Sequence, residues 1–155
     1  MAMHSPARFS IRADPARDVM YADVSGFFFA RDVAAFDAAW WETRKQLSCG
    51  TNEHLTLCDI TDMSIQTREV VIAFTHVVRD PRRRSRRLAM VVGASLSRQQ
   101  AQRLPEPGRP DVGFFFDRAE AEAWLFSDDR TDARYPHAPA SPRSDDRGYI
   151  GRSVA

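Results

Sequence analysis

A chain of 155 residues has the length of one domain, and its 43% hydrophobic content, with ten Phe and three Trp, can build one core. The formal net charge of +1 excludes the strong basic character of most nucleic-acid-binding domains, and two cysteines exclude a disulfide-rich secreted scaffold. No apolar run approaches the roughly 20 residues of a membrane span. Residues 1–8 lack the apolar segment of a signal peptide, so we expect a cytoplasmic protein without a transmembrane segment.

The first part of the chain predicts a hairpin followed by a helix. Residues 9–13 alternate apolar and polar, and residues 19–26 form a second strand beyond the turn "DPARD". Because this connection is short, the two strands should be antiparallel neighbours. Apolar residues at helical spacing, with Asp32 as the N-cap and Gly50 just past the end, predict a helix over 32–49.

The middle of the chain predicts two buried strands with a helix between them. Residues 53–60 and 88–93 are apolar runs, and the second is typical of a central strand that is covered on both faces. Residues 67–80 carry one wide apolar stripe at helical spacing. Asp80-Pro81 should end this helix, because the residue before a proline resists the helical conformation.

The last predicted elements are a short helix over 97–104, a strand over 112–116 and a final helix. Asp117, followed three residues later by Glu120, has the spacing of a capping box at the start of that helix. The resulting order is β β α β α β α β α. It predicts an α/β sandwich with a mainly parallel sheet of about five strands, in which the first strand is antiparallel at one edge.

These elements divide the chain into an N-terminal extension at residues 1–8, an α/β domain at 9–126 and a tail rich in Pro, Arg and Asp at 127–155. The tail has too few apolar residues to form a second core. We expect it to pack across a second copy of the chain in a symmetric homodimer. Tyr135 and Tyr149 would anchor it, since tyrosine can bury its ring and keep its hydroxyl in water.

Four features of the domain occur in an order that resembles one known family. Ser25-Gly26 ends a strand just before the first helix, and an aspartate ends the strand in "LCDIT". Basic residues lead into "RLAMVVG", and the domain closes with "FFFDRAEAEAWL". Over residues 9–126 these features resemble the SpoIIAA-like family of the STAS and SEC14-like group. The resemblance implies a bacterial, non-enzymatic regulatory domain that acts by binding a protein partner and needs no cofactor.

The segment from Asp59 to Thr67 is the first candidate site. It lies where a strand ends and a helix begins, a place where open α/β sheets bind ligands and where negative charge is favoured. The resemblance implies a phosphorylated serine nearby: Asp59-Ile60-Thr61 matches the first half of the family motif, with Thr for Ser, but "SIQTREVV" lacks the Asp-Ser pair and the glycine of the second half. Asp59, Thr61, Ser64 and Thr67 are therefore candidate regulatory or partner-binding residues. Ordinary capping and turn chemistry is the alternative.

Six arginines between residues 79 and 87 form the second candidate site. One interpretation is a grip for an anion or phosphate. The alternative is a solvated loop that protects the following strand from pairing at its edge. The near-neutral net charge and the lack of nucleic-acid-binding motifs argue against a nucleic-acid partner. The candidate anion-binding residues are Arg82, Arg83, Arg84, Arg86 and Arg87.

The sequence contains no catalytic or metal-binding motif, so we expect neither catalysis nor a bound metal. Cys58 lies within a strand and has no recognisable base beside it. The aromatic runs "FFFA" and "GFFF" either cover both faces of the sheet or leave rings exposed. Two functions therefore stay open. A filled core with a flat surface around Asp59 to Thr67 would favour a protein-binding module, and a pocket lined by Phe and Trp would favour a carrier or sensor of a small apolar or anionic ligand.

Overall fold

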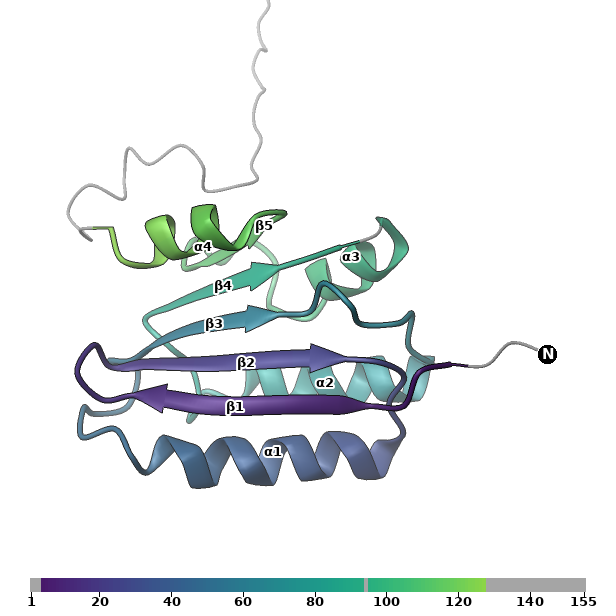
Figure 1. Ribbon diagram of the computed structural model, residues 1–155, viewed down its shortest axis with the longest axis horizontal. Coiled ribbons are helices and arrows are strands. Elements are labelled where there is room, and N and C mark those ends of the chain that lie inside the picture. The colour runs from purple at the N-terminus through teal and green to yellow at the C-terminus, as the bar shows by residue number, and fades with distance from the viewer. Residues whose placement is uncertain (1–3, 94, 128–155) are drawn as a thin grey trace, which may run out of the picture.

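A five-stranded sheet is the centre of the computed structural model, which describes residues 4–93 and 95–127 (Figure 1). The predicted contact of Tyr135 and Tyr149 with a second copy lies outside these residues. Among the described helices, none has the length and apolar character to cross a membrane. The strands are β1 (Arg8–Asp14), β2 (Val19–Ser25), β3 (Leu55–Asp59), β4 (Arg87–Val91) and β5 (Val112–Phe115), and the helices are α1 (Ala30–Arg44), α2 (Arg68–Arg79), α3 (Ser95–Gln102) and α4 (Arg118–Leu125).

The sheet follows the order of the sequence, β1-β2-β3-β4-β5. β1 pairs antiparallel with β2, and every later pair is parallel. The predicted α/β class, the mainly parallel sheet and its antiparallel edge strand are therefore confirmed. The turn between β1 and β2 forms because the Asp14 carboxylate and carbonyl accept hydrogen bonds from the backbone of Ala16 and Arg17.

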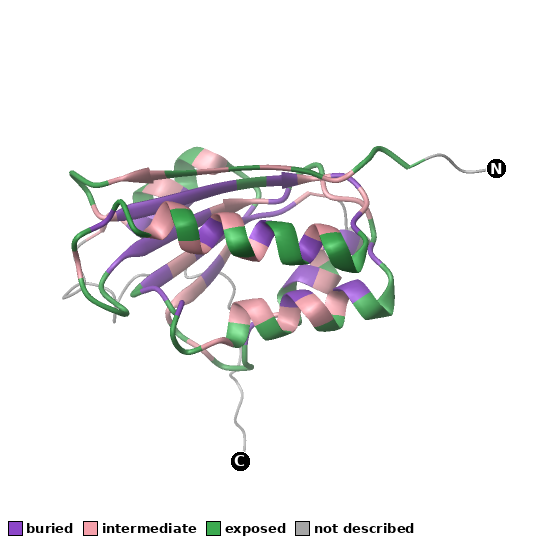
Figure 2. Cartoon of the chain, turned by 90° about the horizontal axis from the view of Figure 1, so that it is seen from below, coloured by how far each residue is buried: buried purple, intermediate pink, exposed green. Residues whose placement is uncertain are grey.

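Helices cover both faces of the sheet. In Figure 2 the central strands, which lie between these helices, are therefore coloured largely as buried. Because strand residues alternate between faces, even-numbered positions of β2 to β5, such as Ala22 and Met90, face α1 and α2. Odd-numbered positions of the same four strands, such as Leu57 and Ala89, face α4, where they pack against Trp124. The continuous apolar runs predicted for the central strands thus have a physical reason, since both faces are covered.

The first helix ends earlier than predicted, and its caps differ. Phe29 is the N-cap of α1, and Asp32 lies in the first turn, where its carboxylate accepts a hydrogen bond from the Phe29 backbone N–H at 2.8 Å. The helix ends at Arg44 and does not reach Gly50. The last carbonyls of the helix, those of Glu42, Thr43 and Arg44, accept hydrogen bonds from backbone N–H groups three residues further on, so the helix closes in tight turns, and the Arg44 guanidinium then holds the carbonyls of Cys49 and Gly50.

Candidate functional site

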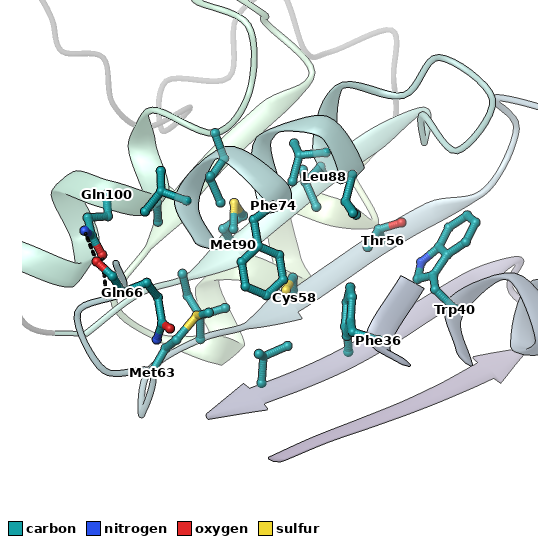
Figure 3. Close-up of a pocket in the computed structure, with 18 of the residues that line it drawn as sticks. Phe36, Trp40, Thr56, Cys58, Met63, Gln66, Phe74, Leu88, Met90 and Gln100 are labelled. Carbon is teal, nitrogen blue, oxygen red and sulfur yellow. Dashed lines mark hydrogen bonds between the residues drawn. The ribbon is translucent and has the colours of Figure 1, made fainter. Parts of the chain in front are cut away.

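A cavity of about 110 Å³ lies between the sheet and α2 (Figure 3). Its floor is formed by Ala22, Cys58 and Met90, which are paired in register across β2, β3 and β4. Two of these three side chains are small. Protein interiors are normally close-packed, and here the small side chains on the floor leave unfilled space beneath α2. The apolar walls come from α1, α2, α3 and the segment after α3, and include Phe36, Trp40, Val71, Phe74, Val77, Val78, Ala101 and Leu104.

One end of the cavity is closed by two glutamines. The side chain of Gln66 accepts a hydrogen bond from the Phe28 backbone N–H and donates to the carbonyls of Gly26 and Ser64, at 2.7–2.9 Å. Gln100 of α3 both accepts from and donates to the Gln66 backbone, at 2.8 and 2.9 Å (Figure 3). These bonds join three connections that follow different strands. Sequence reasoning missed both glutamines, because residues 34 positions apart carry no signal that they meet.

The opposite part of the cavity lining carries arginines. Arg83 is only 8% exposed; its guanidinium pairs with Asp37 of α1 and lies 4.1 Å from the centre of the Trp40 ring. Burial lowers the pKa of Arg83, and Asp37 opposes that effect. Arg109 forms a bidentate ion pair with Asp111 at 2.6 and 3.0 Å. Arg84 approaches the same carboxylate at 3.5 Å.

The predicted arginine site is therefore divided in the structure. Arg82 is exposed and pairs with Asp80 outside the cavity lining, whereas Arg83 and Arg84 line the cavity. Arg87 lies within β4 and donates to the Trp124 carbonyl at the end of α4, on the other face of the sheet. Arg86 is exposed in the lead-in to β4. The run thus does not gather at one surface.

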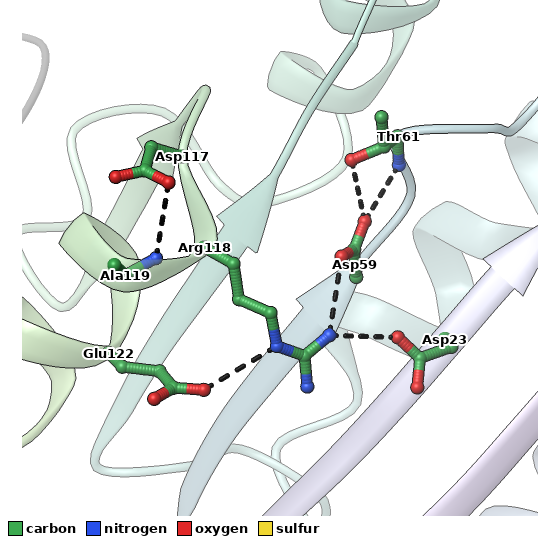
Figure 4. A network of polar contacts seen from close by, with 7 residues as sticks. All are labelled: Asp23, Asp59, Thr61, Asp117, Arg118, Ala119 and Glu122. Atoms are coloured by element: carbon green, nitrogen blue, oxygen red, sulfur yellow. Dashed lines mark hydrogen bonds and ion pairs between the residues drawn. The ribbon is translucent and has the colours of Figure 1, made fainter.

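The start of the predicted Asp59–Thr67 site lies at the carboxyl ends of β2 and β3, where Arg118 of α4 reaches Asp23 at 3.0 Å and Asp59 at 3.3 Å (Figure 4). The other Asp59 oxygen accepts hydrogen bonds from the backbone N–H and the hydroxyl of Thr61, at 3.0 and 2.6 Å. Glu122 also pairs with Arg118. Sequence reasoning found Asp59 and Thr61 but missed Arg118 and Asp23, which are 95 positions apart.

The four predicted regulatory residues separate into three environments. Asp59 and Thr61 bond to each other, whereas Ser64 lines the cavity. Thr67 is the N-cap of α2, and its hydroxyl accepts a hydrogen bond from the Val70 backbone N–H at 3.3 Å. Capping and turn chemistry therefore accounts for the contacts of Thr67 and of the Asp59–Thr61 pair.

Cys58 faces the cavity but does not have the character of a nucleophile. Burial raises the pKa of its thiol to about 12, and the negative charges of Asp59 and Asp23 act in the same direction. The thiol is therefore protonated at neutral pH, whereas nucleophilic cysteines need the thiolate. Among residues 4–93 and 95–127, no group of three His, Cys, Asp or Glu side chains is arranged to hold a metal ion.

Comparison with known proteins gives one informative likeness. No family model and no curated protein sequence matches the chain. A solved structure of an uncharacterized DUF3478-family protein from Shewanella loihica PV-4, described as having a SpoIIAA-like fold, matches with a TM-score of 0.51 and 18% sequence identity. The match covers 81% of this chain and 98% of that one. At this identity the likeness establishes architecture, and the fold of this chain is SpoIIAA-like.

Proposed function

We propose that the domain acts by binding a small, largely apolar ligand in the cavity under α2, without catalysis. The observation that carries this proposal is the cavity itself, which is lined by Phe36, Trp40 and Phe74. A module that works only through its outer surface has no need of a cavity there, and a filled core would be more stable. A pocket with aromatic and aliphatic walls and few polar groups is the usual form of a small-molecule site.

The size of the cavity limits the ligand. An engineered protein cavity of about 150 Å³ with apolar walls stays dry and binds benzene. The cavity of about 110 Å³ is smaller, so it suits a short alkyl chain or one small ring. A long-chain lipid would need α2 to move, because the Gln66–Gln100 bonds close one end.

A titration of the isotope-labelled chain with pentan-1-ol, followed by NMR, tests the proposal. We expect saturable shift changes for residues of the cavity, such as Phe74 and Met90. Cys58→Leu should abolish them, because the larger side chain occupies the floor. Cys49→Leu is the matched control, since Cys49 does not line the cavity. Absence of saturable binding, or equal binding by the Cys58→Leu variant, would refute the proposal.

A second candidate function, binding of a protein partner, is favoured by exposed apolar side chains at the carboxyl edge of the parallel strands. Phe29, Ile65 and Phe116 follow β2, β3 and β5 and are 52%, 49% and 69% exposed. Thr61 and Asp59 lie at the same edge. If this edge binds a partner, a Phe29→Ser/Ile65→Ser variant should lose proteins captured from lysate but keep pentan-1-ol binding. If the variant still captures the same proteins, this edge is not a partner site.

A further inference from the structure

Arg83 is a buried cation with one unsatisfied donor. Asp37 pairs with its Nη2, the Trp40 ring covers the guanidinium, and within the described part of the chain its Nε is buried with no hydrogen-bond partner. Buried donors in proteins are nearly always satisfied, and leaving one on a charged group without a partner is costly. Arg83 also lines the cavity, so a small turn of its side chain would bring Nε to the cavity space, where a ligand can supply the missing acceptor.

The charges at this part of the cavity leave one positive charge uncompensated. Three arginines line it, Arg83, Arg84 and Arg109, and the carboxylates paired with them are Asp37 and Asp111. Three positive and two negative charges leave a net charge of +1. The nearby His54 does not change this balance, because burial, together with Arg44 and Arg83, lowers its pKa to about 4 and keeps the imidazole neutral.

We propose that the ligand is a short-chain monocarboxylate, whose alkyl tail occupies the cavity over Cys58 and Met90 and whose carboxylate accepts a hydrogen bond from Arg83 Nε. This inference rests on the proposed function, namely that the cavity binds a small apolar group. A carboxylate supplies both missing elements, an acceptor for Nε and one negative charge. A guanidinium is well suited to hold it, because its planar donors match carboxylate geometry.

The decisive comparison uses the wild-type chain and two probes with the same tail, pentanoate and pentan-1-ol, at neutral pH. We expect pentanoate to bind about tenfold more tightly, the effect of one hydrogen bond between charged groups. Arg83→Gln should bring the Kd of pentanoate to that of pentan-1-ol and leave pentan-1-ol unchanged. Arg82→Gln is the matched control, because Arg82 pairs with Asp80 and does not line the cavity.

The outcomes separate this inference from the proposed function. If the two probes bind equally, the cavity site stands and the carboxylate inference is wrong. If neither binds, the proposed function fails as well. If pentanoate binds more tightly but Arg83→Gln has no effect, Arg83 does not hold the carboxylate. Should Arg83→Gln unfold because Asp37 is left unpaired, the Asp37→Asn/Arg83→Gln variant replaces it, and the wild-type comparison alone can still overturn the inference.

Discussion

His54 is the residue with the least satisfied surroundings in the described part of the chain. It is 1% exposed, neither ring nitrogen has a hydrogen-bond partner, and its ring centre lies 5.7 Å from that of Trp40. Burial and the charges of Arg44 and Arg83 lower its pKa from 6.5 to about 4. The folded state therefore keeps the imidazole neutral over a pH range in which the unfolded chain binds a proton.

We predict that His54 makes the fold sensitive to mild acid. Since the unfolded chain takes up the proton first, stability is lost as pH falls from 6.5 toward 4 and levels off below that. At about pH 5 the loss should be on the order of 2 kcal/mol relative to about pH 7.5. His54→Leu should remove this part of the pH dependence. Urea denaturation of both proteins at the two pH values measures it, and parallel losses would contradict the assignment.

Gly26 shows how one residue permits a close approach of two segments. Its φ is +87°, and a Cβ there would lie 2.0 Å from the carbonyl oxygen of Pro6. This approach lets the Phe27 backbone N–H donate to the Ser5 carbonyl at 2.9 Å, next to the bridge between Pro6 and Phe27.

We therefore predict that Gly26→Ala destabilises the protein more than Gly108→Ala. Gly108 also has a positive φ, +78°, but open space around the Cβ position. Gly108→Ala should cost about 1–2 kcal/mol for backbone conformation alone, and Gly26→Ala should exceed this because the N-terminal segment must move. Denaturation midpoints of the two variants provide the comparison. Equal losses would mean that Pro6 does not pack against Gly26.

At the scale of elements, the start of α4 depends on one carboxylate. Asp117 is the N-cap, and its side chain accepts a hydrogen bond from the Ala119 backbone N–H at 3.4 Å. The helix places Trp124 and Leu125 against the sheet face that α4 covers, so its position matters for that half of the core.

We predict that Asp117→Ala lowers the free energy of unfolding by about 0.5–2 kcal/mol, the usual effect of losing an N-cap. Glu120→Ala serves as the control: Glu120 is exposed in the same first turn, and its replacement should change stability by no more than about 0.5 kcal/mol. Thermal or urea denaturation measures both. A larger loss for Glu120→Ala would show that the carboxylate that stabilises the helix start had been misidentified.

For the whole molecule, the two faces of the sheet differ in how well they are filled. Cys58 faces the cavity, whereas Ala89 is fully buried against the α4 side. Cys58→Leu should therefore stabilise the ligand-free chain by about 0.5–2 kcal/mol, as cavity-filling substitutions commonly do. Ala89→Leu should destabilise it by about 1–3 kcal/mol through overpacking. Chemical denaturation of the two variants without added ligand measures both effects. If Cys58→Leu destabilises the chain as much as Ala89→Leu does, there is no free space beneath α2.

The strand and helix order was predictable because apolar alternation and helical spacing are local properties of the sequence. Asp117 as an N-cap was predictable for the same reason. The end of α1 was not predictable, because backbone turns satisfy the last carbonyls of the helix, and no Gly is needed there. The sequence could not decide between a filled core and a cavity, since the volume of the cavity depends on how α2 lies over Ala22 and Cys58. The partners of Gln66 and Arg118 are too distant in sequence for any spacing to reveal them.

The strict sequence order of the sheet also has a consequence for how the chain reaches its fold. Each strand pairs with the strand just before it, so no strand must wait for a later one to be inserted between its neighbours. The N-terminal part of a chain leaves the ribosome first, and proteins rich in contacts that are near in sequence fold fastest. The β1–β2 hairpin can therefore act as a template on which β3, β4 and β5 add one at a time as the ribosome releases them. In that order, the growing edge is always the strand made last, and α4 is the final element to cover its face.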